Sequence, residues 1–369
     1  MSESGGSITT RREQRVLEII ETARSKRARF RDKQITLAHG AGGKATQTLI
    51  EGLLVPAFTA SGIGSLAALA DAGAVEVNGT ALAMTTDSFV VKPLRFPGGS
   101  IGELAVNGTV NDLAVSGARA LALSVSLILE EGLDSDVLRA EVEAIASAAR
   151  IAGVEIVAGD TKVVERGAAD GMYICTSGIG AIDPRAELSS EAIVAGDRVL
   201  ISGPIGEHGM AIMLARNLFE LEASIESDTC SLWPAVDALL GALGGELHCM
   251  RDATRGGVAS VLNELARAAG VSVSVREADV PLAPVVAAAA ELLGIDPMYV
   301  ANEGRLVAFV APAVAERALD ALRGVAGCEG AALIGEVRQE PPGMVLVETS
   351  FGGRRVMDQL VGDPLPRIC

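Results

Sequence analysis

The sequence predicts a two-domain protein that combines the α/β and α+β classes. Its 369 residues are about the length of two domains. Strand-like and helix-like patterns alternate along the chain, which is typical of helices layered on sheets. The stretch 183–196 contains a proline, two adjacent serines and mixed charge, and it predicts a linker. We therefore place the domain boundary near residue 190.

The first domain is expected to cover residues 35–190. Apolar runs predict strands, and apolar residues at helical spacing predict the helices between them. The expected strands are 81–91, 120–129, 155–164 and 172–182, and the expected helices are 101–116 and 135–152.

The second domain, residues 191–350, is expected to be an α+β domain by the same criteria. The expected strands are 197–202, 271–276, 305–310, 332–337 and 344–347, and the expected helices are 209–217, 234–243, 257–269, 284–293 and 314–323.

The two ends of the chain are expected to lie outside both domains. Residues 1–34 form a charged extension, and apolar residues at helical spacing make it partly helical. A solvated or docking helix is one interpretation, and an arm that binds RNA or a partner is the other. Residues 351–369 are expected to form a flexible, extended tail, because Pro364 and Pro366 fix φ and remove two N–H donors.

The tail ends in Cys369. Ten extended residues reach at most about 33–36 Å, which is enough to carry this thiol into a cleft of the same subunit. The alternative is a disordered end that happens to finish in cysteine. The α-carboxylate beside the sulfur should raise the pKa of the thiol, and Arg367 is close enough in sequence to offset that effect.

Composition argues against several classes of protein. A net charge of −16 disfavours a general nucleic-acid binder. The apolar run 121–129 is too short to span a membrane and is broken by two serines, and the polar N-terminus does not resemble a signal peptide. Five cysteines without a CxxC pair or zinc spacing fit the reducing cytoplasm. We expect a cytoplasmic protein without nucleic-acid or membrane partners.

Two glycine-rich stretches predict contact with phosphate. In the first, Gly40, Gly42 and Gly43 stand beside Lys44, so backbone N–H groups could surround phosphate oxygens and the lysine would add charge. This is not a Walker A loop, because alanines replace the required glycine and Ser/Thr. A plain glycine turn is the alternative.

The second glycine-rich stretch opens the helix expected at 257–269. Arg255 and Gly256 stand just before it, where backbone N–H groups favour anions and glycine allows close approach. A helix N-cap formed by an Asp or Thr of the same stretch is the alternative, and the two roles are compatible.

Three aspartates predict a Mg²⁺ site. Asp87 interrupts an apolar strand, Asp252 precedes a helix, and Asp112 lies beside Asn107 and Asn111, which share a helix face. Mg²⁺ takes oxygen ligands and usually bridges carboxylates to nucleotide phosphates. The alternatives are a strand-end cap for Asp87 and interhelical hydrogen bonds for the two asparagines.

A further polar group follows the strand expected at 155–164. Asp160, Thr161 and Lys162 stand at its end, where α/β folds display functional side chains. A structural salt bridge is the alternative. One Mg·ATP site explains all these stretches better than separate structural explanations do.

These motifs, in this order, resemble the HypE family within the PurM/aminoimidazole ribonucleotide synthetase-like superfamily. The resemblance runs from about residue 35 to the end, and the terminal Pro-Arg-Ile-Cys is its most specific feature. The matching stretches are 37–44, 111–114, 159–162, 252–257, 302–304 and 366–369.

The resemblance implies a PurM-like fold whose N-terminal sheet domain dimerises, with ATP sites shared between subunits and a C-terminal tail that enters the site. The implied reaction is ATP-dependent dehydration of an S-carbamoyl group on Cys369 to a thiocyanate, as a source of cyanide for the iron of [NiFe]-hydrogenase. A HypF-like carbamoyltransferase and a HypC–HypD-like iron scaffold are the implied partners.

The resemblance also implies roles for single residues. Glu303 and Lys162 would handle the protons of the carboxamide nitrogen, and the three aspartates would hold Mg²⁺. Lys44 and Arg255 would bind phosphate. The alternatives are another PurM-like ATP-using enzyme, such as a small-molecule kinase or synthetase, and a non-catalytic carrier of a group on Cys369.

Overall fold

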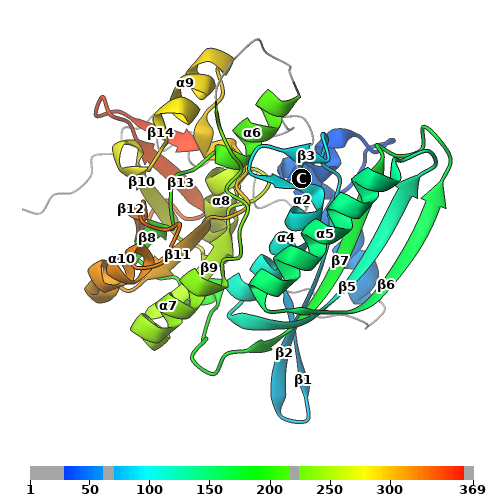
Figure 1. The fold of residues 1–369 in the computed structure, drawn as a ribbon. Helices are drawn as coiled ribbons and strands as arrows, with labels where there is room; N and C mark the ends of the chain where they lie inside the picture. Colours follow the sequence, from blue (N-terminus) through cyan, green and yellow to red (C-terminus); the bar gives the residue numbers. More distant parts are fainter. Residues whose placement is uncertain (1–28, 61–69, 217–223, 361–369) are drawn as a thin grey trace, which may run out of the picture.

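The computed structural model describes residues 29–60, 70–216 and 224–360 (Figure 1). It contains two large mixed sheets that lie side by side, each packed against helices. The N-terminal stretch that precedes the first sheet consists of η1 (Leu37–Gly40), α2 (Lys44–Leu49), η2 (Ile50–Leu54) and α3 (Val55–Ala60).

The first sheet has the order β1-β2-β7-β5-β6 and is antiparallel except for the β5–β6 pair. Its strands are β1 (Gly73–Val77), β2 (Thr80–Phe89), β5 (Ala118–Glu130), β6 (Glu155–Val164) and β7 (Met172–Ile182). The helices α4 (Ile101–Val115) and α5 (Ser135–Ala152) cover one face of it, and the short strands β3 (Arg95–Phe96) and β4 (Gly99–Ser100) precede α4.

Helix α4 is the centre of the molecule, because it contacts the first sheet, α5 and the second domain. Its small residues allow this close packing. A Cβ at Gly102 would lie 2.5 Å from the Glu141 carbonyl oxygen of α5, and one at Gly108 would lie 2.8 Å from the ring of Phe89. Larger residues at these two positions would push the helix away from its neighbours.

The second sheet has the order β14-β13-β10-β12-β8-β11-β9. Its strands are β8 (Arg198–Ile201), β9 (Leu247–Asp252), β10 (Ser272–Arg276), β11 (Leu306–Val310), β12 (Ala332–Arg338), β13 (Met344–Glu348) and β14 (Arg354–Met357). The helices of this domain are α6 (Glu207–Ala215), α7 (Trp233–Leu243), α8 (Gly257–Ala269), α9 (Pro284–Leu293) and α10 (Ala315–Arg323), with short 3-10 turns η3 to η7 at Ser190–Ala192, Gly244–Glu246, Glu277–Asp279, Pro297–Tyr299 and Pro312–Val314.

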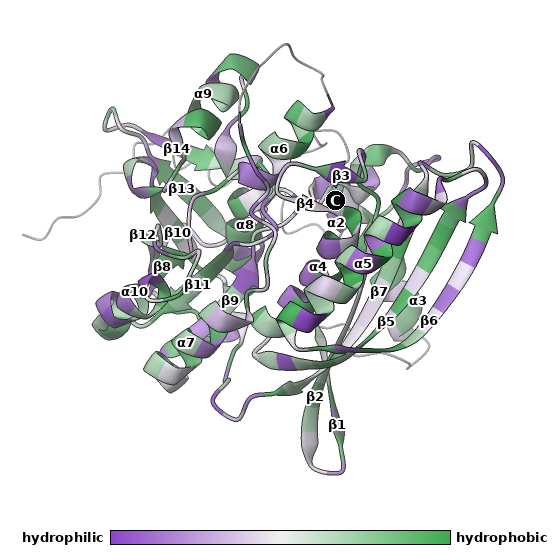
Figure 2. Cartoon of the chain, in the orientation of Figure 1, coloured by the Kyte–Doolittle hydropathy of each residue, from purple (hydrophilic) through white to green (hydrophobic). Residues whose placement is uncertain are grey.

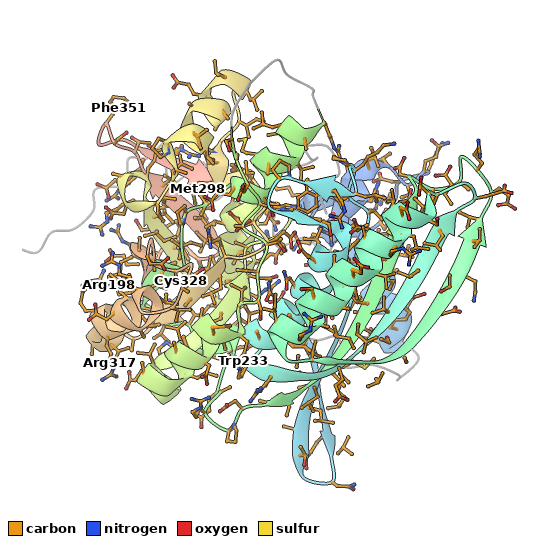
Figure 3. All side chains as sticks on the ribbon, viewed as in Figure 1. Arg198, Trp233, Met298, Arg317, Cys328 and Phe351 are labelled. Atoms are coloured by element: carbon orange, nitrogen blue, oxygen red, sulfur yellow. The ribbon has the colours of Figure 1, made fainter. Side chains whose placement is uncertain are left out.

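Helices cover both faces of this second sheet. Val307 and Phe309 of β11 pack into the cluster that contains α8, whereas Leu306, Ala308 and Val310 pack with α7 and α10. Every residue of β11 is therefore buried, which explains why this strand is an uninterrupted apolar run. Figure 3 labels Trp233 at the start of α7, and Cys328, which is buried in the α7–α10 cluster.

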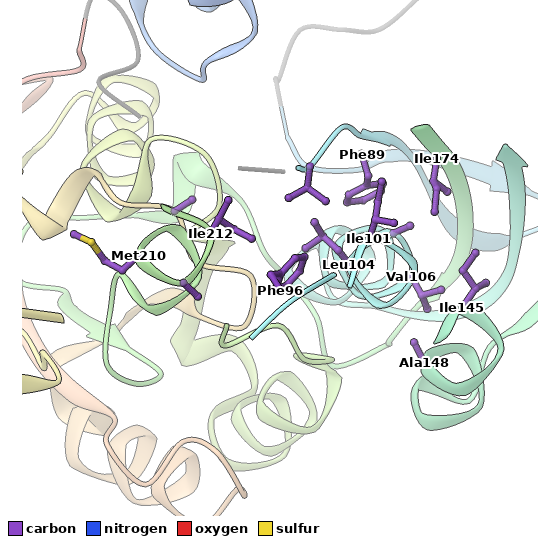
Figure 4. Close-up of a cluster of buried hydrophobic side chains, with 14 of the residues drawn as sticks. Phe89, Phe96, Ile101, Leu104, Val106, Ile145, Ala148, Ile174, Met210 and Ile212 are labelled. Carbon is purple, nitrogen blue, oxygen red and sulfur yellow. The ribbon is translucent and has the colours of Figure 1, made fainter. Parts of the chain in front are cut away.

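A third apolar cluster joins the two domains (Figure 4). Phe89, Ile101 and Leu104 of the first domain belong to the same buried cluster as Met210 and Ile212 of α6. The domains therefore share a core, and the site residues they contribute are held in a defined relation to one another.

Several predicted elements are confirmed with their bounds: 135–152, 155–164, 172–182, 257–269 and 284–293. The sequence missed β1, β9 and β14. The strand β14 lies inside the stretch 351–369, which we expected to be a flexible tail, and it pairs with β13. Residues 1–28 of the expected N-terminal extension and residue 217 of an expected helix lie outside the described residues.

The outer face of the first sheet carries exposed apolar side chains. Val75 and Val77 of β1, Met84 of β2, Leu121 of β5 and Ile179 of β7 are each more than a third exposed. Figure 2 shows hydrophobic colours along the β1–β2 hairpin, away from α4 and α5. Within the described residues, no helix is both long and apolar enough to cross a membrane.

Candidate active site

Three aspartates from distant parts of the chain meet at one point. Asp71, Asp112 and Asp252 each offer a carboxylate oxygen, and these oxygens lie within 4.8 Å of one another. Asp71 precedes β1, Asp112 lies in the last turn of α4, and Asp252 ends β9. The hydroxyl oxygen of Thr85 lies 2.8 Å from Asp112 Oδ2 and 2.9 Å from the Asp71 carbonyl oxygen.

Burial raises the pKa of all three carboxyl groups in this cluster. For Asp112 the charges of Asp252 and Asp71 raise it further. Arg251, whose Nε lies 2.6 Å from Asp71 Oδ2, lowers the pKa of Asp71 but less than burial raises it. Burial raises the pKa of Asp252 to about 8, with Asp71 adding to the effect and Arg251 opposing it. Close carboxylates in a buried site repel one another unless protons or a cation neutralise them.

These residues fit a divalent cation such as Mg²⁺. The donor set consists of carboxylate oxygens, which Mg²⁺ prefers, and it spans both domains. The same cation would stabilise the ionised form of these carboxylates, which burial disfavours.

This geometry predicts a pH-dependent effect of Mg²⁺ on stability. A carboxyl group with a raised pKa binds more protons in the folded state, so its contribution to stability falls as pH rises, for Asp252 between 3.8 and about 8. Mg²⁺ should replace those protons, so we expect the increase in Tm caused by Mg²⁺ to grow with pH across this window. Thermal denaturation with and without MgCl₂ at several pH values measures it, and an increase that does not depend on pH would contradict the cluster as a cation site.

Asp87 lies near the cluster but not in it. Its charge adds to the raised pKa values of Asp112 and Asp252, and its Oδ1 lies 4.0 Å from Arg255 Nη2. The place that the sequence assigned to Asp87 beside Asp112 and Asp252 is taken by Asp71. The sequence reasoning missed Asp71, because β1 was not predicted and a single Asp among alanines carried no motif.

The two glycine-rich stretches meet, as one phosphate site requires. Arg255 Nη1 donates a hydrogen bond to the Gly40 carbonyl oxygen (3.0 Å), and Ser260 Oγ donates to that of Gly42 (3.4 Å). Gly42 and Gly256 both have positive φ, and a Cβ at Gly42 would lie 3.0 Å from the Arg255 carbonyl oxygen. Only glycine permits this approach without strain.

Lys44 is paired inside the protein. Its Nζ lies 2.6 Å from Asp358 Oδ2, and its backbone N–H donates to the Leu360 carbonyl oxygen at 2.9 Å. A Cβ at Gly43 would lie 2.5 Å from the same Leu360 oxygen. The residues after β14 therefore cross the glycine loop, and Asp358 would compete with a phosphate for Lys44.

The two asparagines of α4 form hydrogen bonds with other segments of the same chain. Asn107 Nδ2 donates to Thr229 Oγ1 at 3.2 Å. Asn111 Nδ2 donates to the carbonyl oxygens of Cys230 (2.9 Å) and Glu303 (3.3 Å), and its Oδ1 accepts from Leu232 N–H at 2.7 Å. In this structure Asn111 binds backbone groups of the same chain through both ends of its amide, and the nucleotide contact that the sequence predicted for it stays a prediction.

Glu303 is a buried carboxyl group close to the cluster of Asp71, Asp112 and Asp252. It is 4% exposed and lies in the turn before β11. Burial raises its pKa well above the usual value, and the charges of Asp252, Asp228 and Asp87 raise it further, while Arg255 lowers it. A carboxylate with a raised pKa is a stronger base than an exposed one, which suits it to proton abstraction.

Lys162 and Asp160 lie away from the aspartate cluster of their own chain. They form an exposed 2.6 Å ion pair on the edge strand β6. The pairings of β5 and β7 align Asp160 of β6 with Ser88 of β2, so these two side chains point to the same face of the sheet. Asp87, the neighbour of Ser88, points to the opposite face, where its Oδ2 lies near Gly108 of α4. Asp160 therefore points away from α4.

Strand spacing adds to this separation. Three strand intervals separate β2 from β6, or about 14 Å. Thr161 points to the α5 side and lines a cavity of about 640 Å³ with Val142 and Ile145 of that helix. Lys162 and Glu303, predicted to act as a pair, are therefore not brought together within one chain.

The two residues of the predicted tail chemistry, Arg367 and Cys369, lie outside the described residues. The last described residue, Leu360, contacts the glycine loop. From there, nine residues could span at most about 30 Å.

Two parts of the chain match models of known domain families. Residues 69–182 match the N-terminal domain of AIR synthase related proteins, and residues 194–347 match the C-terminal domain. Carbamoyl dehydratase HypE of Rhodobacter capsulatus is 48% identical over 340 residues, which are 92% of this chain and 99% of that protein. The chain belongs to the HypE carbamoyl dehydratase family.

Solved structures give the same result. The chain is similar to a HypE–HypF complex (TM-score 0.78, 41% identity, 84% of this chain and 100% of that one). It is also similar to HypE in complex with ATP (TM-score 0.76, 43% identity, 91% and 100%). ThiL, a thiamine monophosphate kinase, in complex with AMPPCP and TMP is 18% identical with a TM-score of 0.64, and this shows a shared PurM-like fold alone.

Proposed function

We propose that this protein uses Mg·ATP to dehydrate an S-carbamoyl group on Cys369 to a thiocyanate, as a source of the cyanide ligand of [NiFe]-hydrogenase iron. The observation that carries the proposal is the cluster of Asp71, Asp112 and Asp252 beside the buried Glu303, in a chain 48% identical to a carbamoyl dehydratase. A metal-phosphate site next to a base is what this reaction needs.

The chemistry requires a leaving group and a base. The carboxamide oxygen of R–S–CO–NH₂ attacks the γ-phosphorus of ATP, ADP leaves, and one nitrogen proton is lost. Expulsion of phosphate with loss of the second nitrogen proton then gives R–S–C≡N. Mg²⁺ on the aspartate cluster would supply charge neutralisation for the phosphates.

We assign the residues by chemistry and position. Glu303 takes the nitrogen protons, because it is a buried carboxylate with a raised pKa near the cluster. Arg255 and the glycine loop around Gly42 bind the phosphates, and Lys44 joins them after leaving Asp358. Arg367 lowers the pKa of the Cys369 thiol that receives the carbamoyl group.

A homodimer would complete the site. Asp160, Thr161 and Lys162 lie on an edge strand and away from the aspartate cluster of their own chain. The exposed apolar residues on the outer face of the same sheet are suited to packing against a second copy. We propose that this face dimerises and that Lys162 serves the site of the partner subunit.

Two protein partners follow from the chemistry and the family. The solved HypE–HypF complex supports a HypF-like carbamoyltransferase as the donor of the carbamoyl group. A HypC–HypD-like iron scaffold would accept the cyanide. We propose a cytoplasmic setting, in which a free terminal thiol stays reduced.

The test is ATP turnover that depends on the charged thiol. With carbamoyl phosphate, a HypF-like enzyme and Mg·ATP, we expect one ADP released per carbamoyl group loaded. Cys369→Ala should release none beyond the background, and Cys328→Ala, which removes a free thiol in the α7–α10 cluster, should behave as wild type. Equal ADP release from Cys369→Ala would reject Cys369 as the substrate-bearing residue.

A second candidate function is phosphorylation of a small molecule, since the kinase ThiL shares the fold. In that case ADP release would depend on a diffusible substrate and would not change in Cys369→Ala. The same experiment therefore separates the two functions.

A further inference from the structure

A single extended segment, residues 225–232, runs between α4 and the turn that carries Glu303. We call it the strap. On one side Asn107 and Asn111 of α4 bind Thr229 and Cys230. The strap thus connects the helix that carries Asp112 to the turn of the proposed base.

Asp228 of the strap faces this turn directly. Its side chain is fully buried. Its Oδ1 accepts a hydrogen bond from Glu303 N–H at 3.1 Å, and its Oδ2 accepts from Gly304 N–H at 3.2 Å. Arg305 Nε lies 3.7 Å from the same Oδ2 and balances part of the charge.

These two contacts hold the peptide planes on both sides of the Glu303 Cα. The N–H of Glu303 belongs to the preceding plane, and the N–H of Gly304 belongs to the following one. Asn111 binds the Glu303 carbonyl oxygen, which lies in that second plane. With both planes held, the direction of the Cα–Cβ bond is set, and only side-chain torsions remain free.

The turn packs directly against the strap. A Cβ at Gly304 would lie 1.9 Å from the Asp228 carbonyl oxygen and 2.7 Å from Cys230 Sγ. Gly304 is therefore required for the turn to sit on the strap. Burial of a carboxylate costs desolvation free energy, but its charge-assisted hydrogen bonds are about twice as strong as neutral ones.

We propose that Asp228 is a positioning residue, which holds the Glu303 turn so that the Glu303 carboxylate points at the reacting carboxamide. This inference rests on the role proposed for Glu303. Catalysis is sensitive to such placement, because a misplacement of about 1 Å can cost about 10²-fold in rate.

The experiment compares Asp228→Asn with a neighbouring control. Asn keeps the size of the side chain but supplies one acceptor in place of two. Ser227→Ala also removes two contacts of the strap, with His208 Nδ1 (2.8 Å) and Thr229 N–H (3.2 Å), and none with Glu303. Both variants are assayed as full-length protein with a HypF-like enzyme, carbamoyl phosphate and Mg·ATP.

We expect Asp228→Asn to lower kcat about 10- to 100-fold with an unchanged KM for ATP, and Ser227→Ala to leave both unchanged. An unchanged kcat for Asp228→Asn, or an equal loss in Ser227→Ala, would overturn the proposal. If Asp228→Asn does not fold, Asp228→Ser, which is smaller and also lacks the charge, replaces it under the same criteria.

A double variant separates this inference from the proposed function. If Asp228 acts through Glu303, adding Asp228→Asn to Glu303→Gln should cause no further loss, whereas multiplied losses would overturn the positioning role. If Glu303→Gln alone keeps wild-type activity, the proposed role of Glu303 is what fails, and the positioning role fails with it.

Discussion

Asp112→Asn is expected to remove ATP-dependent turnover while making the metal-free protein more stable. Asp112 has a strongly raised pKa, because it is buried and faces Asp252 and Asp71. Asn keeps its size and removes one charge from the cluster, so the repulsion in the metal-free state decreases. Loss of one carboxylate also weakens Mg²⁺ binding, and we expect turnover to fall at least about 10²-fold.

The two effects are measured separately. Thermal denaturation at pH 8 without metal should give a higher Tm for Asp112→Asn than for wild type, and added Mg²⁺ should raise the Tm of wild type only. Asp136→Asn is the matched control, because Asp136 is exposed on α5, and it should change neither turnover nor the response of Tm to Mg²⁺. A variant that is destabilised and still stabilised by Mg²⁺ would show that the cluster is not the metal site.

Glu303→Gln is expected to stop dehydration while ATP still binds. Gln preserves the shape of the buried side chain but cannot accept the nitrogen protons. Loss of a general base typically costs about 10²- to 10⁴-fold in rate, so we expect a fall in kcat of that size with little change in KM for ATP. Glu316→Gln on the exposed face of α10 is the control and should be neutral.

The pH profile gives a second view of the same residue. Burial raises the pKa of Glu303, and only the ionised form is a base. The activity of wild type should therefore rise with pH until this group has ionised, and the residual activity of Glu303→Gln should lack that limb. An identical pH profile in both proteins would assign the limb to another group.

The sequence predicted much of the fold, because the elements that matter are strongly patterned. α5 has an amphipathic pattern with Asp134 as N-cap and Gly153, with positive φ, as C-cap, and its bounds are confirmed. β9 and β14 were missed because charged residues shorten their apolar pattern: Arg251 and Asp252 end β9, and two adjacent arginines begin β14. Tertiary pairing decides such strands, and local pattern does not.

The residues of the candidate site likewise divide into those that belong to a local sequence motif and those that do not. Asp112, Asp252 and the two glycine-rich stretches stood out as local motifs, and the fold brings them together. Asp71 and Asp228 carry no motif, and their roles come from contacts with residues far away in sequence. Asn111 stood out correctly as a polar residue in an apolar helix, but only the position of the strap shows that it holds backbone groups.

Lys44 illustrates a state that sequence cannot specify. Its place beside three glycines predicted phosphate binding, and the structure pairs it with Asp358. The pairing links Asp358, which follows β14, to the glycine loop. A phosphate that draws Lys44 away would remove that contact from the tail.

The central claim is that Cys369 carries the group that is dehydrated, and intact-mass measurement tests it most directly. Wild-type protein is first incubated with carbamoyl phosphate and a HypF-like enzyme, and then with Mg·ATP. We predict a first species heavier by one carbamoyl group and a second species lighter than the first by one water, with peptide mapping placing both on Cys369. Glu303→Gln should stop at the first species and Cys369→Ala should form neither. An adduct on wild type that keeps its full mass while ATP is hydrolysed would contradict the account.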